Sequence, residues 1–172
     1  GERVNCVYEH IDWDASAAEK CGYPHFMIKE IMEQPEAIAK TIAPRISNGR
    51  IELGFKHITA EMLKKVNSIK IIGCGSAYHV GFVAGYFMRA ALRIPVESVL
   101  ASEFRYDDPI VDENTLAIVI SQSGETLDTL YGLREAKKHG AKTIAIVNVV
   151  GSTIANESEM SFTLGPVPKL PL

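Results

Sequence analysis

The sequence alternates between short runs of β-branched and aliphatic residues and longer stretches in which apolar residues recur every three or four positions. The short runs predict strands at residues 69–72, 96–100, 116–120, 143–148 and 160–164. Helical spacing follows the first run as far as about Leu92 and the third as far as Lys138, after which Gly140 is a natural stop. Strands that alternate with helices in this way favour right-handed βαβ units and hence a parallel sheet.

We therefore predict an α/β fold with a doubly wound, flavodoxin-like parallel sheet of about five strands in the order 2-1-3-4-5, in three layers α-β-α. A helical pattern precedes the sheet from His25 to Ile42, and Pro35 either kinks this helix or starts a second one. Residues 45–56 have the composition of a loop, and Thr59 is placed to cap a short helix. We expect these N-terminal helices to cover the sheet.

Three hydroxyl side chains lie in the turn that follows the third predicted strand. Ser121, Ser123 and Thr126 surround Gly124, and helical spacing resumes directly afterwards. Because the backbone N–H groups of residues 122–126 then lie at a helix N-terminus, they favour a single bound phosphate. The turn has no lysine or arginine and no G-x-x-x-x-G-K-[ST] pattern, which argues against a nucleoside triphosphate. The simpler alternative is an ordinary turn in which the hydroxyls only cap the helix.

A second glycine-containing loop follows the first predicted strand. Gly73 and Gly75 resemble the start of a dinucleotide fingerprint, but its third glycine would fall on Tyr78, which argues against a Rossmann cofactor site. In the strand order given above, the Gly75–Ser76 loop and the turn at residues 121–126 both lie at the topological switch point. Open α/β sheets bind ligands at this point. The sequence therefore predicts one ligand site built from both loops.

Composition and charge exclude several other classes of function. A net charge of −3 without a long basic run argues against nucleic acid as the main partner. No run approaches the roughly 20 apolar residues of a membrane span, and we expect no signal peptide. Cys6, Cys21 and Cys74 form no C-x-x-C pair, which is typical of thiols in a reducing cytoplasm, and the histidines are too scattered for a metal site. We expect a cytoplasmic protein with no metal and no cofactor.

Several motifs together resemble one known family. Cys74-Gly-Ser76, Ala101-Ser-Glu-Phe-Arg105 and the turn at residues 121–126 are similar to motifs of the sugar isomerase (SIS) domain. More narrowly, residues 23–159 resemble the isomerase half of glutamine–fructose-6-phosphate aminotransferases, also called glucosamine-6-phosphate synthases. The resemblance implies that the phosphate and sugar hydroxyls are held by Gly75, Ser76, Ser121, Gln122, Ser123 and Thr126. Ala77 stands where many members have a serine, so only its backbone N–H could contribute.

The resemblance also implies a division of the chain and a set of absent parts. Residues 1–24 correspond to a linker from a glutaminase domain, residues 25–164 to the first of two SIS domains, and residues 165–172 to a Pro-rich tail unlike the family. We interpret this tail as the result of a frameshift or an artificial terminus. The groups that release ammonia and transfer protons belong to the glutaminase domain and the second SIS domain. We therefore expect no catalytic residues here, no activity from the chain alone, and a homodimer.

Two other functions share this fold. A sugar-phosphate-sensing module of a transcription regulator would need a basic helix-turn-helix before the sheet, whereas residues 9–14 are acidic. A stand-alone sugar-phosphate isomerase or deglycase is the second alternative, and residues 26–30 and 102–105 favour the aminotransferase over it. A nucleophilic hydrolase is disfavoured, because neither Ser121 nor Ser123 lies in G-x-S-x-G.

Overall fold

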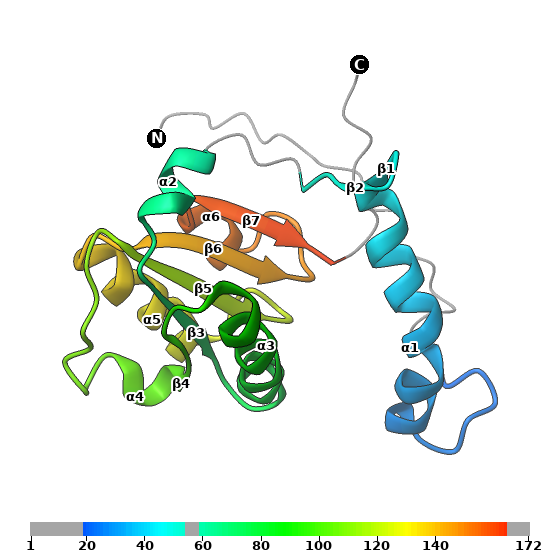
Figure 1. Ribbon diagram of the computed structural model, residues 1–172. Helices are drawn as coiled ribbons and strands as arrows, with labels where there is room; N and C mark the ends of the chain where they lie inside the picture. The colour runs from blue at the N-terminus through cyan, green and yellow to red at the C-terminus, as the bar shows by residue number, and fades with distance from the viewer. Residues whose placement is uncertain (1–18, 54–58, 165–172) are drawn as a thin grey trace, which may run out of the picture. The chain divides into compact units, whose positions relative to one another are not determined.

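The computed structural model describes residues 19–53 and 59–164 (Figure 1). Residues 1–18 of the predicted linker at 1–24, part of the predicted loop and the predicted tail at 165–172 lie outside these ranges. The chain divides into two compact units, one ending at Ile42 and the other beginning at Ala43.

The first unit is dominated by one long helix, α1 (Phe26–Ile42). Pro35 lies inside it, so the helix continues through the proline rather than restarting there. Proline removes one helical hydrogen bond and crowds the carbonyl four residues before it, yet α1 continues for seven residues beyond Pro35. Lys29 is buried, and its Nζ donates to the Glu19 carbonyl at 2.7 Å, which ties the helix to the segment before it.

The second unit begins with a small hairpin where a loop was predicted. After the 3₁₀ helix η2 (Ala43–Arg45), strands β1 (Ile46–Ser47) and β2 (Arg50–Ile51) pair antiparallel. The prediction of a loop at 45–56 was therefore wrong for this part of it. Asn48 and Gly49 have φ angles of 50° and 73°, and this left-handed pair makes the two-residue turn that closes hairpins.

In the described residues of the second unit, five strands and five helices follow the hairpin. The strands β3 (Ser68–Gly73), β4 (Val96–Leu100), β5 (Thr115–Ser121), β6 (Lys142–Val147) and β7 (Met160–Thr163) are all parallel, in the order β4-β3-β5-β6-β7. This is the predicted 2-1-3-4-5 order. The helices are α2 (Ala60–Lys65), α3 (Ser76–Leu92), α4 (Ala101–Phe104), α5 (Leu127–Lys138) and α6 (Thr153–Glu157). Thr59 caps α2 as predicted, accepting from the Met62 N–H at 3.2 Å.

Helices cover both faces of the sheet, so the predicted three-layer α/β architecture is confirmed (Figure 1). Side chains of α4, α5 and α6 form one core with alternate strand residues such as Ala117 and Val119. On the other face, Leu116 and its neighbours pack beneath Ala84 and Met88 of α3. β5 is thus buried on both faces, as its unbroken apolar run predicted.

Two glycines allow the helices to lie close to the sheet. A Cβ atom on Gly81 of α3 would come 2.7 Å from Ile71 Cγ2, and one on Gly132 of α5 would come 2.9 Å from Ile72 Cγ2. These approaches bring the N-termini of α3 and α5 over the carboxyl ends of β3 and β5. The close packing expected of a third fingerprint glycine at position 78 is therefore provided one turn later, at Gly81.

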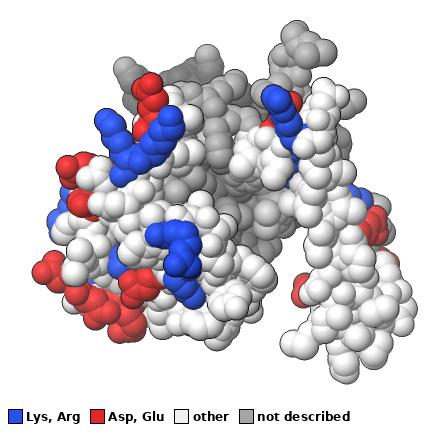
Figure 2. Space-filling model, viewed as in Figure 1, with Lys and Arg blue, Asp and Glu red and all other residues white. Residues whose placement is uncertain are grey.

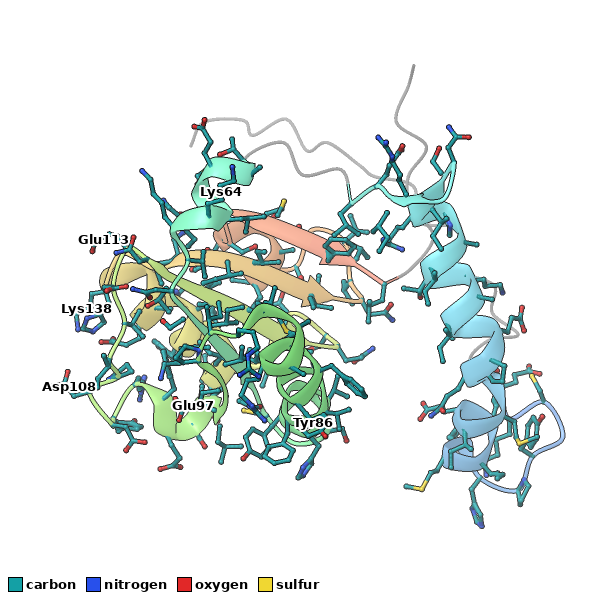
Figure 3. The ribbon with its side chains drawn as sticks, in the orientation of Figure 1. Lys64, Tyr86, Glu97, Asp108, Glu113 and Lys138 are labelled. Carbon is teal, nitrogen blue, oxygen red and sulfur yellow. The ribbon has the colours of Figure 1, made fainter. Side chains whose placement is uncertain are left out.

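The outer side of α3 is apolar. Its side chains Val80, Phe82, Val83, Tyr86 and Phe87 are each more than half exposed. Figure 3 shows Tyr86 pointing away from the sheet. On the face drawn in Figure 2, carboxylates gather over α4 and the loop after it, whereas Lys and Arg form small separate groups. Within the described ranges, none of the helices has the length and hydropathy that crossing a membrane requires.

Candidate functional site

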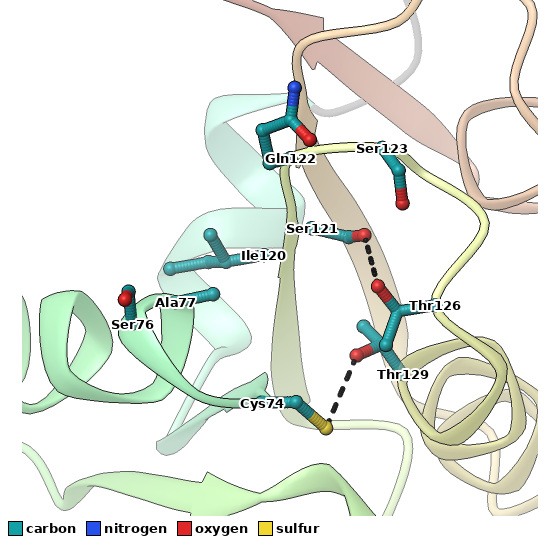
Figure 4. Close-up of a pocket in the computed structure, with 9 residues that line it drawn as sticks. All are labelled: Cys74, Ser76, Ala77, Ile120, Ser121, Gln122, Ser123, Thr126 and Thr129. Carbon is teal, nitrogen blue, oxygen red and sulfur yellow. Dashed lines mark hydrogen bonds between the residues drawn. The ribbon is translucent and has the colours of Figure 1, made fainter. Parts of the chain in front are cut away.

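A pocket of about 210 Å³ opens where β3 and β5 end and α3 and α5 begin (Figure 4). It is lined by Cys74, Ser76, Ala77, Ile120, Ser121, Gln122, Ser123, Thr126 and Thr129. The structure thus brings together every predicted substrate-binding residue except Gly75. The volume lies below the roughly 300–1,000 Å³ of pockets for drug-sized molecules, so the pocket suits a small ligand.

Ser121 organises the hydroxyl-rich turn from inside. It is 3% exposed, and its Oγ accepts a hydrogen bond from the Gly124 N–H at 3.0 Å. The same oxygen lies 3.0 Å from Thr126 Oγ1, and either hydroxyl can donate (Figure 4). Each hydroxyl carries one proton, so one proton of this pair is used between them and the other is left for a ligand. Half-buried Thr126 is the more accessible member of the pair.

Fewer backbone N–H groups are left available for a ligand than the sequence predicted. The Gly124 N–H is bonded to Ser121, and the Glu125 N–H donates to Ser123 Oγ at 3.2 Å. Short polar side chains compete for nearby backbone groups in this way, and sequence spacing does not reveal it. In the described part of the chain, the N–H groups of Ser123 and Thr126 have no hydrogen-bond partner. Thr126 is the N-cap of α5, but its side chain makes no capping bond.

The N-terminus of α3 forms the opposite wall. Gly75 is the N-cap of this helix with a φ of 53°, a conformation that glycine adopts without strain. Gly75 therefore shapes the wall without lining the pocket. Ser76 is exposed at the first helical position. The Ala77 N–H, which the sequence left as a possible ligand donor, is bonded to the Cys74 carbonyl at 3.1 Å. The Ala77 N–H is thus already taken by the backbone.

Comparison with known proteins decides the family. The SIS domain family model matches residues 62–170. The chain belongs to the SIS domain family. It is 54% identical over 160 residues to glutamine–fructose-6-phosphate aminotransferase [isomerizing] from Clostridium acetobutylicum. The matched region covers 92% of this chain and 26% of the relative. The enzyme of the same name from Streptomyces coelicolor is 52% identical over 151 residues, or 87% of this chain and 25% of the relative.

Solved structures give the same assignment. The C-terminal domain of glucosamine-fructose-6-phosphate aminotransferase from Francisella tularensis matches this SIS domain with a TM-score of 0.77 and 40% identity, over 85% of this chain and 41% of that chain. Tagatose-6-phosphate ketose/aldose isomerase from Escherichia coli shares the fold, with a TM-score of 0.68 and 16% identity over 90% of this chain and 42% of that chain. The chain spans about a quarter of the length of the curated relatives given above.

Three pocket residues of this SIS domain were missed by sequence reasoning: Cys74, Ile120 and Thr129. Thr129 is fully buried, and its Oγ1 lies 3.7 Å from Cys74 Sγ, so the two side chains meet between β3 and α5 (Figure 4). Thr129 follows Thr126 by three positions and so lies on the same helix face, which is a signal that could have identified it. Cys74 stands between two glycines of the first loop and could have been found from its position there.

The pocket of this SIS domain is lined by uncharged residues throughout. The nearby carboxylate of Glu125 turns to α6, where its Oε1 accepts from the Thr153 N–H at 2.7 Å, and this bond lowers the pKa of Glu125. Favourable potential for an anion therefore comes from the N-termini of α3 and α5. Within residues 19–53 and 59–164, no three His, Cys, Asp or Glu side chains gather as metal ligands would.

Proposed function

We propose that this chain is the first sugar isomerase domain of a glutamine–fructose-6-phosphate aminotransferase, and that it binds fructose 6-phosphate and glucosamine 6-phosphate. One observation carries the proposal: a small uncharged pocket joins a hydroxyl-rich turn to two helix N-termini, an arrangement that suits one phosphate and a polar sugar. The 54% identity to the Clostridium acetobutylicum enzyme supports this choice of substrate.

In this proposal the phosphate lies over the turn at the start of α5. Thr126 and Ser123 each offer a backbone N–H and a hydroxyl, and Ser76 adds a hydroxyl from α3. The Ser123 oxygen already accepts from Glu125, so its own proton is available to the phosphate. Gln122 is exposed at the rim, where its amide can reach the sugar hydroxyls.

The remaining chemistry is assigned to other parts of the enzyme. The chain spans about a quarter of the relatives' length, and we propose that ammonia release and proton transfer take place in the rest. The 172-residue chain alone should then form no glucosamine 6-phosphate from fructose 6-phosphate and glutamine. The stand-alone isomerase and the transcription-regulator module are less well supported, because the curated relatives given above are aminotransferases and the match to the Escherichia coli isomerase is one of fold, at 16% identity.

We further propose that the chain pairs with a second copy and works in the cytoplasm. The outer side of α3 is apolar, and the guanidinium of Arg89 is directed to the Val96 carbonyl at 2.6 Å rather than outward. Large exposed apolar patches commonly mark protein interaction sites. A face without outward charge can also meet its own copy without repulsion, as the symmetry of a dimer requires.

Titration of three variants with glucosamine 6-phosphate tests the binding site. Hydrogen bonds to a charged group are worth about 1.5–3 kcal/mol, so Thr126→Ala and Ser123→Ala should each weaken binding roughly 10- to 150-fold. Ser161→Ala is the matched control, because Ser161 is exposed on β7 outside the pocket. Equal affinity in all three variants would place the ligand elsewhere.

A further inference from the structure

The segment after β6 lies beside the hydroxyl-rich turn and is bonded to it. β5 and β6 pair up to Ser121 and Val147, so the residues that follow the two strands stay adjacent. The Asn148 N–H donates to the Gln122 carbonyl at 3.1 Å, and the Ile154 N–H donates to the Gly124 carbonyl at 3.0 Å. These two backbone bonds fix the first half of the turn.

Gly124 is pressed against this segment. A Cβ atom at Gly124, which has a φ of 69°, would lie 2.0 Å from Ser152 Oγ. Ser152 is 4% exposed, and its Oγ has no hydrogen-bond partner among the described residues. A buried hydroxyl without a partner is unfavourable, so its position is imposed by the packing of the two segments. The centre of the turn thus packs closely against Ser152.

The second half of the turn is held by a side chain. Glu125 Oε1 accepts from the Thr153 N–H at 2.7 Å. Thr153 is the first residue of α6, whose N-cap Ser152 makes no side-chain capping bond, so Glu125 takes over that task from another element. The next residue after Glu125 is Thr126, which lines the pocket.

A negative charge here needs a reason, because a carboxylate beside a phosphate site repels the phosphate. If only its charge mattered, removing the Glu125 carboxylate would strengthen phosphate binding. We propose that Glu125 is a positioning residue: its bond to the Thr153 N–H holds the second half of the turn, including Thr126, in the shape that receives the phosphate. This inference rests on the proposed function and deepens it.

Two substitutions at one position separate the hydrogen bond from the charge. Glu125→Ala removes both, and it should weaken glucosamine 6-phosphate binding roughly 3- to 10-fold, because a loosened turn must be ordered again on binding. Glu125→Gln keeps an oxygen that accepts from Thr153 but removes the charge. Its affinity should equal or exceed that of the wild type. Glu113→Ala, an exposed carboxylate at the opposite end of β5, is the matched control and should bind as the wild type does.

A third substitution removes the donor instead of the acceptor. Thr153→Pro deletes the N–H that Glu125 uses, and proline is well tolerated at the first position of a helix. Ser152 before it has a φ of −62° and a ψ of 159°, which a residue preceding proline readily adopts. Thr153→Pro should weaken binding as much as Glu125→Ala. The double variant should be no weaker than either one, because both remove the same bond.

Isothermal titration of the 172-residue chain decides among the outcomes. If the wild type does not bind glucosamine 6-phosphate, the proposed function fails and this inference fails with it. If the wild type binds and Glu125→Ala binds equally or more tightly, this inference alone is overturned. If Glu125→Ala and Glu125→Gln lose the same affinity, the inference is also overturned, because the hydrogen bond to the Thr153 N–H would then make no difference. Amide exchange of the unsubstituted chain adds a measurement independent of variant folding: ligand should slow exchange at the Thr153 N–H, and an unchanged rate contradicts the proposal.

Discussion

Replacing Ser121 with alanine tests whether the phosphate turn is organised from inside. Ser121 is 3% exposed, and its Oγ holds the Gly124 N–H and Thr126 Oγ1, each at 3.0 Å. Alanine leaves the buried Gly124 N–H without a partner, which costs about 1–3 kcal/mol, and removes the bond to Thr126, worth about 1 kcal/mol. We therefore expect the free energy of unfolding to fall by about 2–4 kcal/mol.

Urea unfolding followed by circular dichroism measures this loss. Thr126→Ala should lose only the shared hydroxyl bond, about 1 kcal/mol, because the Thr126 side chain makes no capping bond. Ser161→Ala, at an exposed position of β7, should stay within about 0.5 kcal/mol of the wild type. Ser121→Ala should thus be the least stable of the three variants, and it should also bind glucosamine 6-phosphate more weakly than Ser161→Ala.

One result would refute this reasoning. If Ser121→Ala unfolds at the same urea concentration as Ser161→Ala and yet loses its affinity for glucosamine 6-phosphate, Ser121 contacts the ligand directly. Its bonds to Gly124 and Thr126 would then contribute nothing measurable to the turn.

Three further expectations follow from the packing, the charges and the surface. Gly124→Ala should lower the melting temperature by several degrees, because its Cβ would lie 2.0 Å from Ser152 Oγ and the residue has a positive φ; Ser152→Gly in the same chain should restore part of the loss. A bond from Arg134 lowers the pKa of Glu157 below its ordinary 4.5, so this pair stabilises the fold above that pH and the contribution disappears as the pH falls through the lowered pKa. Arg134→Gln should therefore flatten the loss of stability in acid unfolding. Phe87→Lys should convert a dimer to a monomer in sedimentation velocity, and a monomeric wild type would contradict the pairing.

The central strand of this SIS domain could be predicted because burial on both faces leaves its apolar run unbroken, whereas the edge strands β4 and β7 carry polar residues and are only partly buried. The run 116–120 became β5 (Thr115–Ser121) within a residue at each end. Helix α6 (Thr153–Glu157) was not predicted, since five residues are too few to show helical periodicity. The hairpin at Ile46–Ile51 was missed because strands of two residues are too short to show an alternating pattern, although Asn48-Gly49 marked its turn.

The sequence predicted most of the residues that line the candidate site, but not the hydrogen bonds among them. Hydroxyl residues at 121, 123 and 126 and the glycine loop at 75 could be placed together because parallel strands end at one edge of the sheet. The sequence could not show which backbone N–H groups remain available to a ligand, because the hydroxyls of Ser121 and Ser123 accept from the N–H groups of Gly124 and Glu125. The support from Thr153 comes from a different βα segment, and sequence spacing gives no sign of it.

The central claim, that a sugar phosphate binds over the turn between β5 and α5, is tested most directly by an NMR titration of amide signals. Glucosamine 6-phosphate should shift the N–H signals of Ser123 and Thr126 most, because these donors are unoccupied among the described residues. Inorganic phosphate should move the same signals at higher concentration, and glucosamine without phosphate should leave them in place. Saturable shifts centred on another part of the chain, or none at these two amides, would contradict the account.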